Sequence, residues 1–298
     1  MDDAARKQQE SFWAQSAEFW RKNDEMEARL TRPVSERMLD LARVSTGMHV
    51  LDVACGYGEP AVPAAHRVGP HGRVLGVDLV EGRLQAARER ADREGLKNLE
   101  FLAADAEALR AGEKRFDVAT LRWGLMYMRA PERALESIHR ALKPGGVLVI
   151  ASWAEPARVP YASLPRRTLA RYRDVPQPIP DGPGVFRHAV ASSLNAILEQ
   201  TGFHVEALEE LEVPVVEARD GRGVVAWLRQ MGGPFMKLVG ELPEHQQRTW
   251  EDDLATEAEK HRAGERVLLG GVTRLTLARK PEGGNMQPNL KDSPPGDT

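Results

Sequence analysis

Two glycines that follow an apolar run have the types and spacing needed to hold a nucleotide. Within His49–Pro60, the run Val50–Val53 predicts a buried strand, which breaks at Gly56 and Gly58 before a helix that begins near Pro60. Glycines let the backbone pass close to a ligand, and a helix N-terminus offers free N–H groups to it. The segment therefore predicts a nucleotide cradle.

The next predicted strand narrows the nucleotide to two cofactors. The spacing Gly56-x-Gly58-x-x-Ala61 fits the loose dinucleotide fingerprint, and the strand Arg73–Asp78 ends in an acid about 20 residues after the loop. The two oxygens of Asp78 can accept hydrogen bonds from both hydroxyls of a ribose. These features fit NAD as well as S-adenosylmethionine (SAM).

Three further segments separate the two cofactors. Asp52 lies inside the first strand, Leu102–Ala106 ends a third strand with an acid, and Leu142–Ile150 carries a Lys-Pro-Gly-Gly turn before another strand. Together with the glycine loop they resemble the class I SAM-dependent methyltransferases, in full order from about Leu30 to Trp153. The resemblance implies an α/β fold: a Rossmann-like, seven-stranded, mostly parallel sheet with helices on both faces, an N-terminal helical lid and a helical cap.

The resemblance also implies the residues that bind SAM. Asp78 is expected to hold the ribose, Leu79 to pack on the adenine, and Asp105 with the backbone of Ala106 to bind the adenine amino group. An alternative for Asp105 is that it caps a short helix through Leu109. The other predicted residues of the cofactor site are Asp52, Ala54, Cys55, Gly56, Gly58, Arg122 and Trp13. Of these, Asp52 is expected to orient the glycine loop rather than to take part in the chemistry.

The segment after the fourth predicted strand, Leu121–Met128, resembles the ubiquinone/menaquinone-biosynthesis-like (methyltransferase type 11) branch of the family. Arg122 is expected to pair with the carboxylate of SAM or with an acid on the substrate, the alternative being a surface salt bridge. Trp123, Tyr127 and Phe186 are predicted to line the acceptor pocket. Arg122 and Trp123 stand where catechol-type enzymes carry a carboxylate for Mg²⁺, so no metal site is predicted.

Two titratable side chains near the Pro- and Gly-rich stretch Pro156–Phe186 are candidate catalytic bases. Tyr161 and His188 are the groups expected to reach the methyl position, and histidine is the better base because its unperturbed pKa is about 6.5. The alternative is that His188 is a loop residue without a role. Carbon or amine acceptors can also react without a protein base.

Alternating strand and helix patterns, with short loops, organise the chain into five expected regions. Residues 1–43 are a helical lid that contains Phe12, Trp13, Phe19 and Trp20, with a separate amphipathic helix at Pro33–Ala42. Residues 44–154 are the SAM-binding core, 155–190 a cap insertion, and 191–280 the rest of the core with cap helices. Residues 281–298 are predicted to be disordered.

Composition limits the partners of this 298-residue chain. Its net charge is -3 and it has no basic block, so nucleic acid is not an expected partner. It has no apolar run long enough to span a bilayer and no signal-peptide core. With Cys55 as the only cysteine, we expect a cytoplasmic enzyme. The sequence does not decide between a monomer and a homodimer.

These features predict a SAM-dependent methyltransferase (EC 2.1.1 class) that yields S-adenosylhomocysteine (SAH). Its acceptor is expected to be an O, C or N atom of a small, apolar or aromatic metabolite in natural-product or quinone-type biosynthesis. One alternative is a NAD-dependent oxidoreductase. Another is a protein with the SAM fold that binds the cofactor without methyl transfer, or that catalyses another rearrangement. The sequence does not identify the acceptor.

Overall fold

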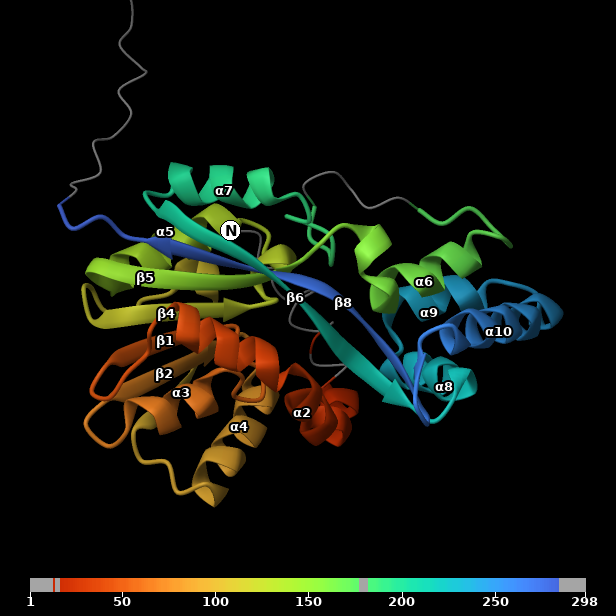
Figure 1. Cartoon of the computed structure of the whole chain (residues 1–298), viewed down its shortest axis with the longest axis horizontal. Helices are drawn as coiled ribbons and strands as arrows, with labels where there is room; N and C mark the ends of the chain where they lie inside the picture. The colour runs from red at the N-terminus through yellow and green to blue at the C-terminus, as the bar shows by residue number, and fades with distance from the viewer. Residues whose placement is uncertain (1–12, 14–16, 177–181, 284–298) are drawn as a thin grey trace, which may run out of the picture.

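A single mixed sheet forms the centre of the computed structural model, which describes residues 13, 17–176 and 182–283. Its strands are β1 (His49–Val53), β2 (Arg73–Asp78), β3 (Leu99–Ala103), β4 (Phe116–Arg122), β5 (Leu142–Trp153), β6 (His204–Ala218), β7 (Arg262–Ala263) and β8 (Arg266–Arg279). Seven of them lie in the order β3-β2-β1-β4-β5-β8-β6, and the two-residue β7 pairs with β8 (Figure 1). Pairing is parallel from β3 to β5, whereas β8 is antiparallel to both neighbours. The predicted mostly parallel, Rossmann-like sheet is confirmed.

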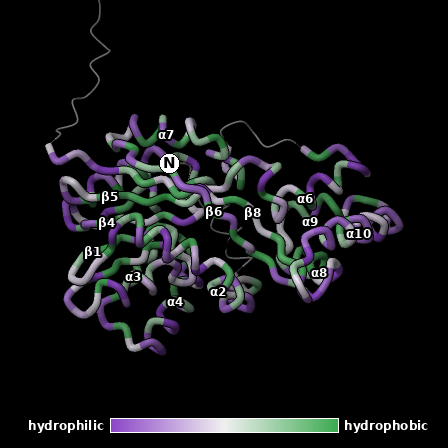
Figure 2. The backbone as a smooth tube through the Cα atoms, in the orientation of Figure 1, coloured by the Kyte–Doolittle hydropathy of each residue, from purple (hydrophilic) through white to green (hydrophobic). Residues whose placement is uncertain are grey.

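Side chains that alternate along each central strand divide the core into two layers. Val50 belongs to a cluster with α2 (Ala17–Leu41), α3 (Ala61–Val68) and α4 (Glu81–Arg93). Leu51 points the other way, into a cluster with α5 (Pro131–Ala141) and α7 (Ala191–Gln200). The central strands are largely hydrophobic, whereas hydrophilic residues dominate α4 and α10 (Figure 2). Helices therefore cover both faces, as this alternation requires.

The N-terminal region differs from its prediction. Instead of a separate helix at Pro33–Ala42, one helix, α2, runs through Pro33. Proline removes one backbone hydrogen bond, so contacts with other elements must hold the helix together. Arg37 forms a bidentate pair with Glu209 on β6, with distances of 2.7 and 2.6 Å. Residues 1–12 and 14–16 of the predicted lid, which include Phe12, lie outside the described residues, as does the tail from residue 284.

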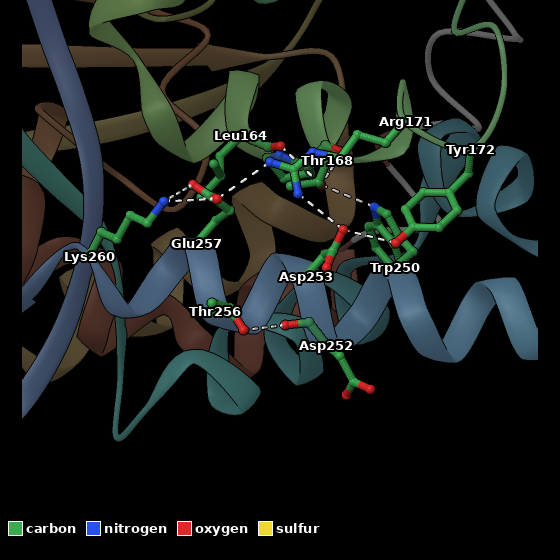
Figure 3. Close-up of polar contacts among 11 residues, drawn as sticks. Leu164, Thr168, Arg171, Tyr172, Trp250, Asp252, Asp253, Thr256, Glu257 and Lys260 are labelled. Atoms are coloured by element: carbon green, nitrogen blue, oxygen red, sulfur yellow. Dashed lines mark hydrogen bonds and ion pairs between the residues drawn. The ribbon is translucent and has the colours of Figure 1, made fainter.

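A third hydrophobic cluster forms the cap beyond the sheet, where the ends of β6 and β8 carry α6 (Pro160–Leu169), α8 (Gly221–Met231), α9 (Gly233–Gly240) and α10 (Glu244–Glu259) (Figure 1). The fully buried Trp250 donates from its Nε1 to Thr168, at 3.1 Å (Figure 3). Asp253 accepts from Arg171 at 3.0 Å and from Tyr172 at 2.8 Å. These bonds fix α10 against the segment that begins with α6.

Candidate active site

The glycine loop is tied to the acid at the end of β2. Asp78 is buried, and its Oδ2 accepts from the backbone N–H of Gly56 at 2.9 Å, while its Oδ1 accepts from that of Val80 at 3.0 Å. Gly56 has a φ of 53°, in the left-handed region that favours glycine. Each carboxylate oxygen has a further lone pair, so Asp78 can still accept from ribose hydroxyls. The carboxylate and the loop therefore lie side by side, and the ribose contact stays a prediction.

One cavity of about 450 Å³ begins at this loop. This volume falls within the roughly 300–1,000 Å³ typical of small-molecule sites. At one end, which we call the cofactor end, the walls are Ala54, Cys55, Gly56, Tyr57, Asp78, Leu79, Asp105 and Ala106. At the other, the acceptor end, they are Trp123, Tyr127, Trp153, Tyr161, Val215 and Trp227. Trp13, Glu27, Arg83 and Arg122 also line the cavity.

Asp105 combines the two roles that the sequence left open. Its Oδ1 accepts from the backbone N–H of Glu107 at 2.9 Å, which caps the short helix η1 (Ala106–Ala108). The same residue lines the cavity with Leu79 and Ala106. Capping one turn leaves the second carboxylate oxygen available, so the adenine contact stays a prediction.

The floor of the cavity is tightly built where β1 and β4 end. Ala54 has a φ of 58°, although it is not a glycine. A Cβ placed on Gly124 would lie 2.5 Å from the Cβ of Ala54. Gly124 must therefore be a glycine so that the two loops can meet. Such strained backbone is concentrated at functional sites.

The acceptor end is a wall of aromatic rings from several elements. Trp123, at the end of β4, stacks on Trp153 with ring centroids 4.6 Å apart and planes 9° apart. Trp123 also has a left-handed φ of 54°, and its Nε1 donates to Thr273 on β8 at 2.9 Å. Tyr161 of α6 lies 5.0 Å from Trp153, and Trp13 meets Tyr127 edge to face at 4.9 Å. The arrangement suits a flat, apolar ligand.

The two tyrosine hydroxyls in this wall are poor bases. Burial raises the pKa of Tyr127, and it raises the pKa of Tyr161 well above its ordinary value. Both phenols therefore keep their protons near neutral pH. These hydroxyls can donate hydrogen bonds to a bound substrate, but they cannot remove a proton from it.

The structure moves His188 and Phe186 away from their predicted places. Neither lines the cavity. His188 is buried, and its Nδ1 lies 3.3 Å from the Oγ of Ser193, at the start of α7. Phe186 packs against the hydrophobic core beside it. The reason is that the segment before α7 packs on the loop that follows β4, where Arg187 donates to the carbonyl of Met128 at 2.5 Å.

Two predicted cofactor residues act behind the loop rather than in the cavity wall. Asp52 is fully buried, and its Oδ1 accepts from Thr120 on β4 at 2.8 Å. Gly58 has a φ of 91°, and a Cβ there would lie 2.9 Å from Val62 of α3. Its small size therefore serves the packing of loop on helix. Neither residue lines the cavity.

Arg122 lines the cavity but is bound to α2. Its Nη1 donates to the Oγ1 of Thr31 at 2.6 Å, and its Nη2 lies 3.5 Å from Glu27. The guanidinium also lies 4.8 Å from the ring of Trp123. Arg122 thus holds the N-terminal helix beside the site. The salt bridge with Glu27 corresponds to the alternative that the sequence offered, except that it is largely buried rather than on the surface.

Several cavity residues were absent from the prediction: Glu27, Tyr57, Arg83, Trp153 and Trp227. Tyr57 lies between the two loop glycines and Trp153 ends β5, so the rule that ligands bind at the carboxyl ends of parallel strands points to both. Trp227 lies on α8, and no local sequence pattern there identifies it as a residue that lines the cavity.

Within the described ranges, no group of three or more His, Cys, Asp or Glu side chains is placed to hold a metal ion. No helix in that part of the chain is long and apolar enough to cross a membrane.

The sheet order and the acid-braced glycine loop define the class I SAM-dependent methyltransferase fold. Residues 44–190, just under half of the chain, match the family model described as "Methyltransferase domain". The match is consistent with the ubiquinone/menaquinone-type branch suggested by the fourth-strand segment.

Several known proteins are similar to this chain in sequence or in fold. The ubiquinone/menaquinone biosynthesis C-methyltransferase UbiE of Pseudomonas entomophila is 35% identical over 153 residues, which are 51% of this chain and 60% of that protein. The match thus spans less than two thirds of the relative. Two solved structures share the fold. One is titled as the [4+2]-cyclase SpnF (TM-score 0.52, 22% identity, 84% of this chain and 82% of that chain). The other is titled for conversion of a disulfide bond into a thioacetal group during echinomycin biosynthesis (TM-score 0.55, 24% identity, 85% and 82%).

Proposed function

We propose that this protein transfers the methyl group of SAM to a small apolar or aromatic metabolite in the cytoplasm. The observation that carries the proposal is the single cavity that joins the Asp78 loop to the aromatic wall. A cofactor held at the first end and an acceptor held at the second would meet within it. The methyl group on the SAM sulfonium is already electrophilic, so the chain's main task is alignment.

The residues of the cofactor end fit SAM. Asp78 is fixed by two backbone N–H groups and can still accept from ribose hydroxyls, while Leu79 offers an apolar surface to the adenine. Asp105 and Ala106 offer an acceptor and a backbone donor to the adenine edge. Holding two reactants in this way can supply ~7–11 kcal/mol of the barrier.

The acceptor end supports alignment rather than base catalysis. Tyr127 and Tyr161 keep their protons, and His188 lies outside the cavity wall. An acceptor that arrives ionised needs no protein base, and a carbon acceptor can lose its ring proton to water after the methyl transfer. We therefore expect His188→Gln to keep the wild-type rate and pH profile, because proximity does the work that we first assigned to this histidine.

The curated relatives' names supply the acceptor class. UbiE is named as a C-methyltransferase of ubiquinone and menaquinone biosynthesis, which favours quinone-type or related aromatic acceptors for this chain too. The likeness to SpnF, whose title names a cyclase, keeps a rearrangement without methyl transfer as the alternative.

Labelled SAM tests the proposal directly. The protein is incubated with methyl-labelled SAM and a panel of small phenols, quinols and aromatic amines, and products are separated and analysed. We expect label in one acceptor class, at an O, C or N atom that the product analysis identifies. Binding of SAH without any labelled product across the panel would favour the cyclase-like alternative, and binding of NAD in place of SAH would favour an oxidoreductase.

A further inference from the structure

Arg83 lies over the glycine loop, and none of the roles predicted from the sequence was assigned to it. It lies in the first turn of α4 and lines the cavity. Its guanidinium carbon is 5.1 Å from the ring centroid of Tyr57 and 5.2 Å from that of Trp13. A Cβ placed on Gly56 would lie 3.5 Å from its Nη2. The cation therefore lies directly above the loop that a bound cofactor must cross.

The guanidinium of Arg83 has a donor to spare. Its Nε is buried and has no hydrogen-bond partner among the described residues. Burial disfavours the charge, but attraction to Asp78, Tyr57 and Glu27 outweighs it and raises the pKa of Arg83 above its ordinary value. The side chain is thus a permanent cation, held between two aromatic rings, with an N–H group directed at no acceptor. A buried donor left in this state costs free energy unless a ligand satisfies it.

The other buried arginines of the cavity are committed to protein partners. Arg122 donates to Thr31 and lies beside Glu27. Arg90 donates to Glu59 at 2.9 Å and to Glu94 at 3.1 Å. Arg83 differs because no ion pair to it is found in the described ranges. It has a side-chain hydrogen bond with Tyr57, the acids around it act at a distance, and its Nε keeps an unused donor.

We propose that Arg83 recognises the amino-acid carboxylate of SAM and SAH. The inference rests on the proposed function, since it requires a cofactor of this kind. A carboxylate matches the fork of a guanidinium and can accept two parallel hydrogen bonds from it. Asp78 would then select the ribose and Arg83 the opposite end of the cofactor, with Gly56 between them. Arg122, which the sequence suggested for this role, is left to hold α2.

Paired ligands test the inference through binding alone. SAH carries the carboxylate, whereas 5′-methylthioadenosine has the same adenine, ribose and sulfur without the amino-acid end. Calorimetric titrations compare the wild type with Arg83→Met, Arg83→Lys and the control Arg88→Met. Arg88 lies on the same helix and pairs with the exposed Glu81 at 2.5 Å.

We expect Arg83→Met to weaken SAH binding roughly tenfold to hundredfold, the range for hydrogen bonds to a charged group, and to change methylthioadenosine binding less than about twofold. Arg83→Lys should recover part of the SAH affinity, and Arg88→Met should change neither. An equal loss for both ligands would contradict the inference, because Arg83 would then merely order the loop. So would an unchanged or higher SAH affinity. If the folded wild type binds neither ligand, the proposed function itself fails.

Discussion

The two ends of the cavity are built in different ways. The cofactor end comes from adjacent strand ends within Asp52–Glu107 and is held by backbone hydrogen bonds, such as those that Asp78 accepts from Gly56 and Val80. The acceptor end gathers aromatic rings from α6, α8 and the ends of β4 and β5. The first end depends on a local strand–loop–helix geometry. The second depends on how the cap packs against the sheet. Changes in the cap should therefore affect the acceptor end more than the cofactor end.

Removing the largest cap side chain should have the largest effect. Trp250 is fully buried among α6, α9 and α10, and Trp250→Ala should lower the free energy of unfolding by about 3–5 kcal/mol. Because Trp250 lies far along the chain from the glycine loop and outside the cavity wall, SAH affinity should fall much less than acceptor turnover. Thermal melting and calorimetry measure both.

A neighbouring exposed residue is the control for this experiment. Arg248 is on the same helix and makes only a highly exposed pair with Glu244, so Arg248→Ala should change stability by about 0.5 kcal/mol or less. If Trp250→Ala abolishes SAH binding while the protein stays folded, the two ends are not separable.

The floor shared by both ends should be the next most sensitive point. Gly124→Ala introduces a Cβ that would lie 2.5 Å from that of Ala54. This overlap should lower the free energy of unfolding by about 1–3 kcal/mol and should weaken the binding of both SAH and the methyl acceptor. Gly82→Ala is the matched control, because no atom lies within 4 Å of its Cβ. Within helix α4, that control should be neutral or stabilising by up to about 1 kcal/mol. Equal effects in chemical denaturation would contradict the close contact.

Asp52, behind the glycine loop, makes the stability of the fold depend on pH. Burial raises its pKa to about 7, so it is protonated in the folded protein at pH values where the unfolded chain, with a pKa of about 3.9, is ionised. Its contribution to stability therefore falls as pH rises from about 4 to 7, by at most about 1.4 kcal/mol per pH unit.

Asp52→Asn isolates this effect. The difference in unfolding free energy between wild type and variant should change over that pH range and level off above it. His139, whose pKa burial and the nearby Lys280 lower to about 4, contributes a slope of opposite sign in both proteins and cancels in the difference. A difference that is constant from pH 4 to 8 would show that Asp52 ionises normally.

The smallest expected effect concerns the described part of the lid. Trp13 contacts Tyr127 and the guanidinium of Arg83. Trp13→Leu should weaken SAH binding by about 0.5–1.5 kcal/mol, the worth of one aromatic or cation–π contact, and leave the melting temperature unchanged. Phe19→Leu is the matched control, because Phe19 instead meets Trp227 of the cap. An equal loss of SAH affinity in both would mean that the helix acts as a whole.

What the sequence could predict follows from the same comparison. Asp78 and Asp105 were found because an acid at a strand end keeps its place wherever the parallel sheet forms. His188 was misplaced because the path of its segment depends on contacts with the β4 loop and α7, which no local pattern encodes. Likewise α2 continues through Pro33 because Thr31 is bound by Arg122, and Ser35 donates to Glu59 at 2.7 Å. Tertiary contacts there outweigh the local helix-breaking signal.

Calorimetric titration of SAH into the wild type and Asp78→Ala tests the central claim most directly. Asp78 fixes the glycine loop and is assigned the ribose, so its removal should weaken SAH binding by roughly 1.5–3 kcal/mol, at least about tenfold. Circular dichroism establishes that the variant keeps its sheet. If the folded variant binds SAH as tightly as the wild type does, the cavity is not the cofactor site and the account of the molecule is wrong.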